Sequence, residues 1–166
     1  MKSKQDFVTN SSSSSFIVAF DRPVVFLHDI KDNILFIEKA QVVFDDIQKQ
    51  TAIKLELSKE CVDKLTDEIS SGYFDGFISD WEDIKNLKKG DYLTEKEYFD
   101  ARMKASDMYK AKNREIAEKI AIKFIEENKE KAAYIFLYSD EDGRFWSEME
   151  HGGTFDEFPH LTISHH

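Results

Sequence analysis

The chain has 166 residues, the size of one ordinary domain, and 41% of them are hydrophobic, enough for a core that needs no metal or disulfide bond. Acidic residues outnumber basic ones 33 to 23, and the resulting net charge of −10 opposes nonspecific binding to nucleic-acid phosphates. Cys61 is the single cysteine, which excludes an intramolecular disulfide and is typical of a reducing compartment. The sequence contains no signal peptide and no membrane-length apolar run, so we expect a cytoplasmic protein.

The N-terminal residues 1–14 are polar and predict a flexible segment that ends within the serine run Ser11–Ser15. The apolar residues Phe16–Phe20 follow, rich in β-branched and aromatic types. They do not alternate with polar residues, which favours a strand over 15–20 that is buried on both faces. The rest of the chain, residues 15–166, is predicted to form a single domain.

Two helices and a short alternating segment are predicted next. Apolar residues recur at spacings of three and four over 33–50, which indicates a helix. Alternation of apolar and charged residues over 53–57 suggests a short strand, although the run is brief enough to be a loop. A second helix is expected after Ser58, with Gly72 placed to end it.

A long helix is predicted over 94–128, because no glycine or proline interrupts the chain between Thr94 and Gly143. Thr94 and Glu97 have the spacing of a capping box, which would start the helix. At 1.5 Å per residue it would be about 50 Å long, more than a compact domain of this size accommodates. We expect its polar part, Lys104–Arg114, to project from the core and to offer a docking surface or pair with a second copy.

The C-terminal region predicts further strands. Residues 133–138 form a near-continuous apolar run, and 139–143 have the composition of a turn. A hairpin with its second arm over 144–150 and a final strand over 161–165 would follow. The predicted fold class is α+β, with a small, mainly antiparallel sheet of three or four strands from residues 15–20, 133–138, 144–150 and 161–165, covered by helices.

Both ends of the chain resemble a family of uncharacterised bacterial and phage-associated proteins. The N-terminal match consists of Asp6–Asn10, the serine run and Phe16–Val18. The C-terminal match covers Tyr138–Gly143, Glu150–Gly152, Phe155, Pro159–His160 and Ile163–His166. The resemblance implies that His165 and His166 belong to the natural protein. It implies no activity.

Four of the five histidines lie in the last sixteen residues, near acidic side chains. Imidazole and carboxylate are common ligands of divalent transition metals, and imidazole also transfers protons near neutral pH. The candidate metal ligands are His151, His160, His165, His166, Glu148 and Glu150. Their spacing matches no zinc motif, and alternation along strands places them on different faces, so structural or exposed histidines are the favoured interpretation.

Two functions remain open from the sequence. An acidic protein-binding domain without catalysis is favoured by the acidic charge, the long helix and the lack of a strong catalytic motif. The alternative is a metal-binding module or metal-dependent hydrolase that uses the C-terminal histidines. We expect a protein partner or self-association, and we expect no binding to nucleic acid or to a membrane.

Overall fold

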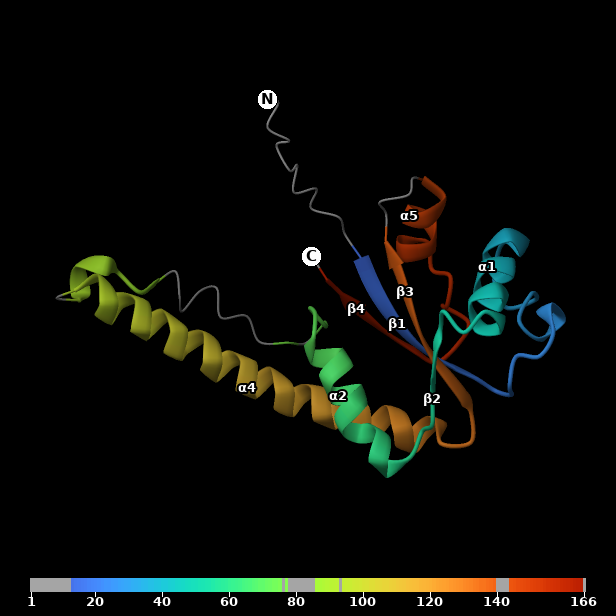
Figure 1. Cartoon of the computed structure of the whole chain (residues 1–166), viewed down its shortest axis with the longest axis horizontal. Coiled ribbons are helices and arrows are strands. Elements are labelled where there is room, and N and C mark those ends of the chain that lie inside the picture. Colours follow the sequence, from blue (N-terminus) through green and yellow to red (C-terminus); the bar gives the residue numbers. More distant parts are fainter. Residues whose placement is uncertain (1–12, 76, 78–85, 93, 140–143, 166) are drawn as a thin grey trace, which may run out of the picture. The chain divides into compact units, whose positions relative to one another are not determined.

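A computed structural model of the chain describes residues 13–75, 77, 86–92, 94–139 and 144–165 (Figure 1). The chain divides into two compact units. The sheet unit consists of Met1–Leu57 and Asn128–His166, and the helical unit of Ser58–Glu127. Most of the expected N-terminal segment lies outside the described residues, but Ser13 and Ser14 already belong to the first strand. The prediction of a single domain over 15–166 stays a prediction.

The sheet unit is built on four strands: β1 (Ser13–Phe20), β2 (Ile53–Leu55), β3 (Ala132–Ser139) and β4 (His160–Ser164). Their order is β2-β3-β1-β4, and every neighbouring pair is antiparallel (Figure 1). The predicted α+β class with an antiparallel sheet is therefore confirmed. The brief alternating segment at 53–57 does form a strand, although it is only three residues long.

Two helices, α1 (Ile37–Gln48) and α5 (Arg144–His151), cover one face of this sheet. The core beneath them is rich in aromatic residues, and the ring of Phe155 lies 5.3 Å from that of Phe16 and 5.0 Å from that of Phe136. Alternate residues of β1 and β3 supply its floor: Phe16, Val18, Phe20, Tyr134, Phe136 and Tyr138. The helices contribute Ala40, Val43 and Met149. The intervening strand residues, such as Ile17 and Ala19, are buried too, as expected for strands without alternation.

The prediction of a strand over 144–150 is wrong, because these residues form the helix α5. Residues 140–143, most of the expected hairpin turn, lie outside the described residues. The segment 144–150 contains no β-branched residue, and its buried positions Met149 and Glu150 lie three and four residues after the half-buried Trp146. That spacing is helical. The turn composition of residues 139–143 predicts a hairpin between two strands. In the structure the strand β3 ends at Ser139, and the next described element is the helix α5.

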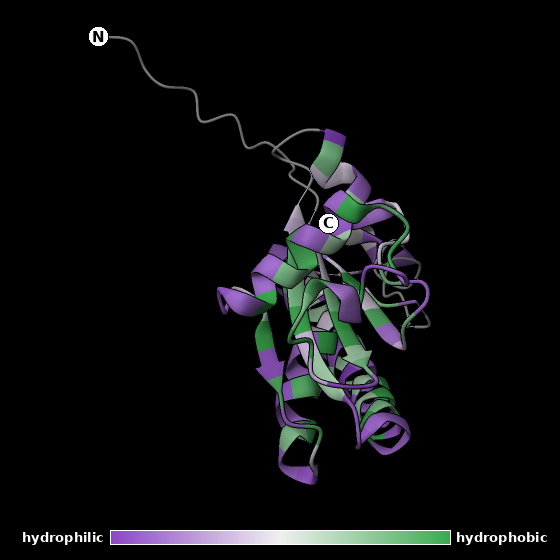
Figure 2. Ribbon diagram, turned by 90° about the vertical axis from the view of Figure 1, so that its right-hand side faces the viewer, coloured by the Kyte–Doolittle hydropathy of each residue, from purple (hydrophilic) through white to green (hydrophobic). Residues whose placement is uncertain are grey.

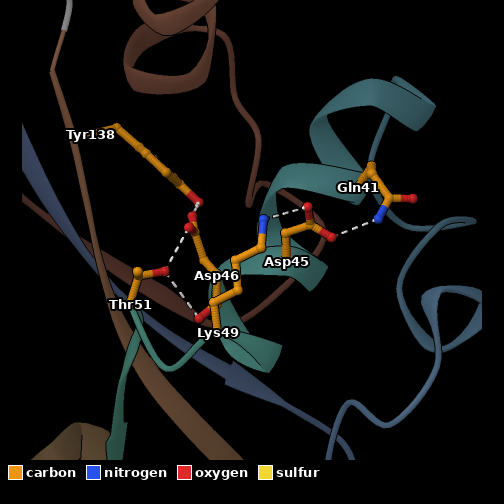
Figure 3. Close-up of polar contacts among 6 residues, drawn as sticks. All are labelled: Gln41, Asp45, Asp46, Lys49, Thr51 and Tyr138. Carbon is orange, nitrogen blue, oxygen red and sulfur yellow. Dashed lines mark hydrogen bonds and ion pairs between the residues drawn. The ribbon is translucent and has the colours of Figure 1, made fainter.

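The C-terminal end of α1 is fixed to the sheet by a cluster of polar contacts (Figure 3). Thr51 N–H donates to the carbonyl of Asp46 and Gln50 N–H to that of Ile47, which is the Schellman pattern of helix termination. Gln50 adopts the left-handed conformation that this motif requires, with φ of 60°. The carboxylate of Asp46 also accepts hydrogen bonds from Thr51 Oγ1 at 2.7 Å and from Tyr138 Oη at 3.0 Å.

The loop between β1 and α1 contains a short 3-10 turn, η1 (Leu27–Asp29). The carboxylate of Asp29 accepts hydrogen bonds from the backbone N–H groups of Val25 and Phe26 and pairs with Arg22 at 2.8 Å. The hydrogen bond from Phe26 is the main reason that the pKa of Asp29 is lowered. This carboxylate therefore holds the loop in place when ionised.

The helical unit contains two 3-10 turns, η2 (Lys59–Cys61) and η3 (Lys89–Asp91), and the helix α2 (Val62–Ser70). It also holds nearly all of the long helix α4 (Glu95–Asn128), which is continuous and about 50 Å long. The predicted capping box is confirmed: Glu97 N–H donates to Thr94 Oγ1, and Thr94 N–H donates to Glu97 Oε2. Arg114 of α4 pairs with Asp67 of α2.

The helices alternate between hydrophilic and hydrophobic residues along their length (Figure 2). Among the described residues, none of the helices combines the length and the apolar character needed to cross a membrane.

Candidate functional site

The predicted metal ligands do not converge in the structure. His160 is the first residue of β4, and His165 follows its last residue. Five residues of extended chain separate them by about 16 Å and place their side chains on opposite faces of the sheet. His160 Nδ1 donates to the carbonyl of Phe158 at 3.0 Å, and His165 Nε2 lies 2.8 Å from Ser15 Oγ. Each ring is held by its own local contact.

The remaining described candidates lie on α5. Glu150 is buried and accepts a 2.9 Å hydrogen bond from Ser14 Oγ of β1, which ties the helix to the sheet. His151 Nε2 lies 3.6 Å from Glu150 Oε2, but its ring is half exposed at the helix end. The side chain of Glu148 is half exposed, and its Oε2 lies 4.0 Å from Lys39 Nζ. Glu150 thus serves as a structural acceptor between α5 and β1.

Within the described ranges, no group of three or more His, Cys, Asp or Glu side chains is arranged to hold a metal ion. His166, the last candidate, lies outside those ranges. A tetrahedral zinc site needs several ligand atoms within about 2.0–2.2 Å of one point. His160 and His165 lie too far apart to bind the same ion. The metal-site hypothesis for the other candidates stays a prediction.

A different feature of the sheet unit is more prominent: Lys39 joins α1 to α5 from a buried position. Its ammonium group donates to the carbonyl of Glu148 at 2.8 Å and to that of Gly152 at 3.2 Å. These carbonyls lie at the C-terminal end of α5, where helix carbonyls lack intrahelical partners and a positive charge is favourable. Lys39 therefore acts as a cap on the neighbouring helix.

Gly152 makes this arrangement feasible. A Cβ atom at this position would lie 2.6 Å from Lys39 Nζ and still closer to the carbonyl oxygen of Glu148. Either contact would force the ammonium or the helix end to move. The small residue thus allows the lysine to approach the carbonyls of α5.

An open groove of about 340 Å³ lies beside Lys39, between the first turns of α1 and α5. Its lining combines aromatic and charged side chains: Phe36, Glu38, Lys39, Arg144, Phe145 and Glu148. Phe36 and Phe145 are both about half exposed, and the Lys39 ammonium lies 5.7 Å from the ring centre of Phe36. The groove is therefore an aromatic surface with charges at its rim.

The aromatic surface continues along the chain beyond the groove. Leu35, which precedes Phe36, is 81% exposed, and Ile37, which follows it, is 51% exposed. Three consecutive large apolar side chains are thus open to solvent at the start of α1. We call Leu35, Phe36, Ile37 and Phe145 the apolar patch. Isolated exposed apolar residues are ordinary, whereas larger contiguous apolar groups are typical of interaction surfaces.

The start of α1 is unusual in the structure. The N-cap of α1 is Phe36, which makes no side-chain capping hydrogen bond, although Ser, Thr, Asp or Asn is preferred at this position. The sequence predicts a helix over 33–50, a range that includes residues 34–37. In the structure Ile34 is buried, whereas the next three residues are exposed. Periodicity alone does not separate these cases, because α1 begins only at Ile37.

The charged side chains around the groove differ in how far they are open to a ligand. Lys39 is buried and already bonded to two carbonyls, so its charge is directed into the fold. Glu38, Glu148 and Arg144 are exposed at the rim. Glu148 Oε2 also lies 4.0 Å from Lys39 Nζ, so the lining carries two carboxylates and two cations, and it is the net charge of −10 of the whole chain that favours a positively charged ligand.

Comparison of the chain with protein-family models, with curated proteins and with solved structures found no match.

Proposed function

We propose that the protein is a cytoplasmic, acidic protein-binding domain that acts without catalysis, and that its sheet unit binds a partner segment at the apolar patch. The observation that carries the proposal is the exposure of Leu35, Phe36 and Ile37 in sequence, beside Phe145 and a groove of about 340 Å³. Aromatic and aliphatic side chains around a concave site supply most of the affinity of protein interfaces. A soluble domain gains nothing for folding from such exposure.

The rim charges define the partner. The exposed carboxylate of Glu38 can pair with Lys or Arg, and the rings of Phe36 and Phe145 present faces for an apolar anchor. The occupant is therefore a segment of another protein with one large aliphatic or aromatic residue next to basic residues. The groove is too small for a whole domain, and it is sized for one or two side chains.

The position of the patch supports a function in binding. Phe36 occupies an N-cap position where a polar residue would stabilise α1, so the chain forgoes a capping bond to keep an aromatic ring at the surface. Departures of this kind from local folding preference concentrate at functional sites.

The experiment is a selection from a random-peptide phage library on the purified full chain. We expect enrichment of peptides with an aromatic or large aliphatic residue flanked by Lys or Arg. The selected peptides should bind Phe145→Glu at least about tenfold more weakly, because a carboxylate replaces a contact ring in the groove. Phe99→Glu is the matched control, since Phe99 is an exposed phenylalanine of the helical unit.

Two outcomes would overturn the proposal. One is a selection that enriches no such motif. The other is a selected peptide that binds wild type and Phe145→Glu equally while losing affinity for Phe99→Glu.

A further inference from the structure

The two edges of the sheet differ in their protection against pairing with another strand. β2 is an edge strand of only three residues and carries Lys54. Short length and lysine are devices by which proteins blunt a sheet edge. β4 forms the other edge with five residues, His160–Ser164, and contains no Asp, Glu, Lys, Arg or Pro. The edge at β4 thus lacks these protections.

The register shows which backbone groups β4 directs outward. Ala19 N–H donates to the carbonyl of Pro159, and His165 N–H donates to that of Ser13. In an antiparallel ladder every second residue forms such a pair, so the residues of β4 that are hydrogen-bonded to β1 have odd numbers between 159 and 165. Residues 161 and 163 therefore face β1. The N–H and C=O groups of His160, Thr162 and Ser164 point away from it, and in the described sheet no strand pairs with them.

We propose that this edge pairs with β4 of a second copy of the chain, antiparallel about a two-fold axis at Thr162. This proposal is independent of the groove. In the two-fold register Thr162 lies opposite its own counterpart, and His160 lies opposite Ser164. Each of the three outward-facing residues of one copy then lies opposite an outward-facing residue of the other copy, so each N–H can donate to a C=O across the two strands. A register centred on residue 161 or 163 would pair fewer of these groups, because only His160 with Thr162, or Thr162 with Ser164, would then lie opposite each other.

Side-chain chemistry fits the same occupant. Two copies of net charge −10 repel each other, and direct contact requires a surface without carboxylates. The strand residues His160, Leu161, Thr162, Ile163 and Ser164 place a Thr–Thr pair at the centre and His–Ser pairs at the ends. Paired threonines on adjacent strands are favourable, and no like charges face each other.

The contact is a small one. One strand pair buries less surface than a permanent dimer needs, so we expect a dissociation constant of about 100 µM that decreases with added salt. The dimer would extend the sheet across two copies and display two apolar patches.

The first measurement is sedimentation equilibrium of the full chain up to about 1 mM. Thr162→Pro removes an N–H that faces away from β1, and Thr162→Val keeps it. We expect the dimer of Thr162→Pro to dissociate at least about tenfold more readily than wild type, and Thr162→Val to dimerise like wild type. A wild type that stays monomeric, or a Thr162→Pro variant that dimerises equally, overturns the proposal.

The second measurement stands even if Thr162→Pro fails to fold. In the proposed register the two Thr162 Cα atoms lie about 5.5 Å apart, within the range that a disulfide spans. Thr162→Cys should therefore form a cross-linked dimer under mild oxidation at least about tenfold faster than Lys54→Cys on the opposite edge. Equal rates for the two variants contradict the pairing of β4 with itself.

Discussion

The hydroxyl of Tyr138 on β3 donates a 3.0 Å hydrogen bond to Asp46 Oδ2 at the end of α1 (Figure 3). The contact joins the sheet to the helix that begins at the apolar patch. Burial of the phenol, followed by the charge and the hydrogen bond of Asp46, raises the pKa of Tyr138 well above its usual range. The orientation of α1 thus depends on a neutral tyrosine beside a carboxylate.

The raised pKa of Tyr138 predicts a loss of stability in alkali. An unfolded tyrosine ionises near pH 10, while the folded protein retains this proton to higher pH. The unfolded state then binds fewer protons, so the free energy of unfolding decreases as the pH rises above about 10. Urea unfolding at pH 8 and at higher pH measures this slope. Tyr138→Phe should lose about 1 kcal/mol at pH 8 and show a shallower alkaline slope.

Lysines also lose protons in that pH range, but they do so in wild type and in Tyr138→Phe alike. The difference between the alkaline slopes of the two proteins therefore reports on Tyr138 alone. Identical alkaline slopes for wild type and Tyr138→Phe would show that folding does not raise the pKa of Tyr138, which would contradict the prediction.

Lys39 is predicted to be the lysine of the sheet unit that matters most for stability. Lys39→Met keeps an apolar side chain but removes the donor to the carbonyls of Glu148 and Gly152. Loss of these buried hydrogen bonds should lower the free energy of unfolding by about 1–3 kcal/mol in urea titrations. The control is Lys49→Met, whose exposed, solvent-screened ion pair with Asp45 should contribute much less. Equal effects would contradict the capping role of Lys39.

Gln50 is a site at which glycine should stabilise the protein. Its φ of 60° places a residue with a Cβ atom in the left-handed region that glycine adopts at no steric cost. Gln50→Gly should raise the free energy of unfolding by about 0.5–1 kcal/mol in thermal or urea unfolding. Gln50→Ala retains the Cβ atom and should give no gain. A destabilised glycine variant would mean that the Gln50 side chain contributes more than its backbone strain costs.

Phe36 is predicted to be dispensable for folding. Phe36→Ser introduces a residue that can cap α1 and removes a ring that is about half exposed. The melting temperature should be equal to or above that of wild type, whereas peptide binding should weaken. Phe155→Ser, in the aromatic core, should lose several kcal/mol and provides the contrast. A comparable loss for Phe36→Ser would place its ring in the core.

The sequence predicted the elements whose patterns are local. The capping box at Thr94 and the uninterrupted run after it identified α4, and the apolar runs identified β1 and β3. The segment 144–150 was misassigned because a turn composition can precede a helix as well as a strand. In the folded chain the ring of Trp146 lies 6.1 Å from that of Tyr138, and Met149 belongs to the same core, contacts that the helical spacing of these two residues allows.

The site was less accessible to sequence reasoning than the fold. The histidines are close in sequence, yet His160 and His165 are separated by the extension of β4 and by strand alternation. The groove unites Phe36 with Phe145, which are more than a hundred residues apart, so no spacing could reveal it. The sequence predicts the helix from residue 33, so it does not show that Phe36 precedes the first turn of α1.

The central claim is that the apolar patch of the sheet unit binds a basic, apolar-anchored peptide. Titration of the isotope-labelled full chain with a selected peptide, followed by two-dimensional NMR, tests it most directly. We predict the largest shift changes at Phe36, Glu38, Phe145 and Glu148, which line the groove, with little change along α4. Shift changes confined to α4, or none at the groove at saturating peptide, would contradict the account.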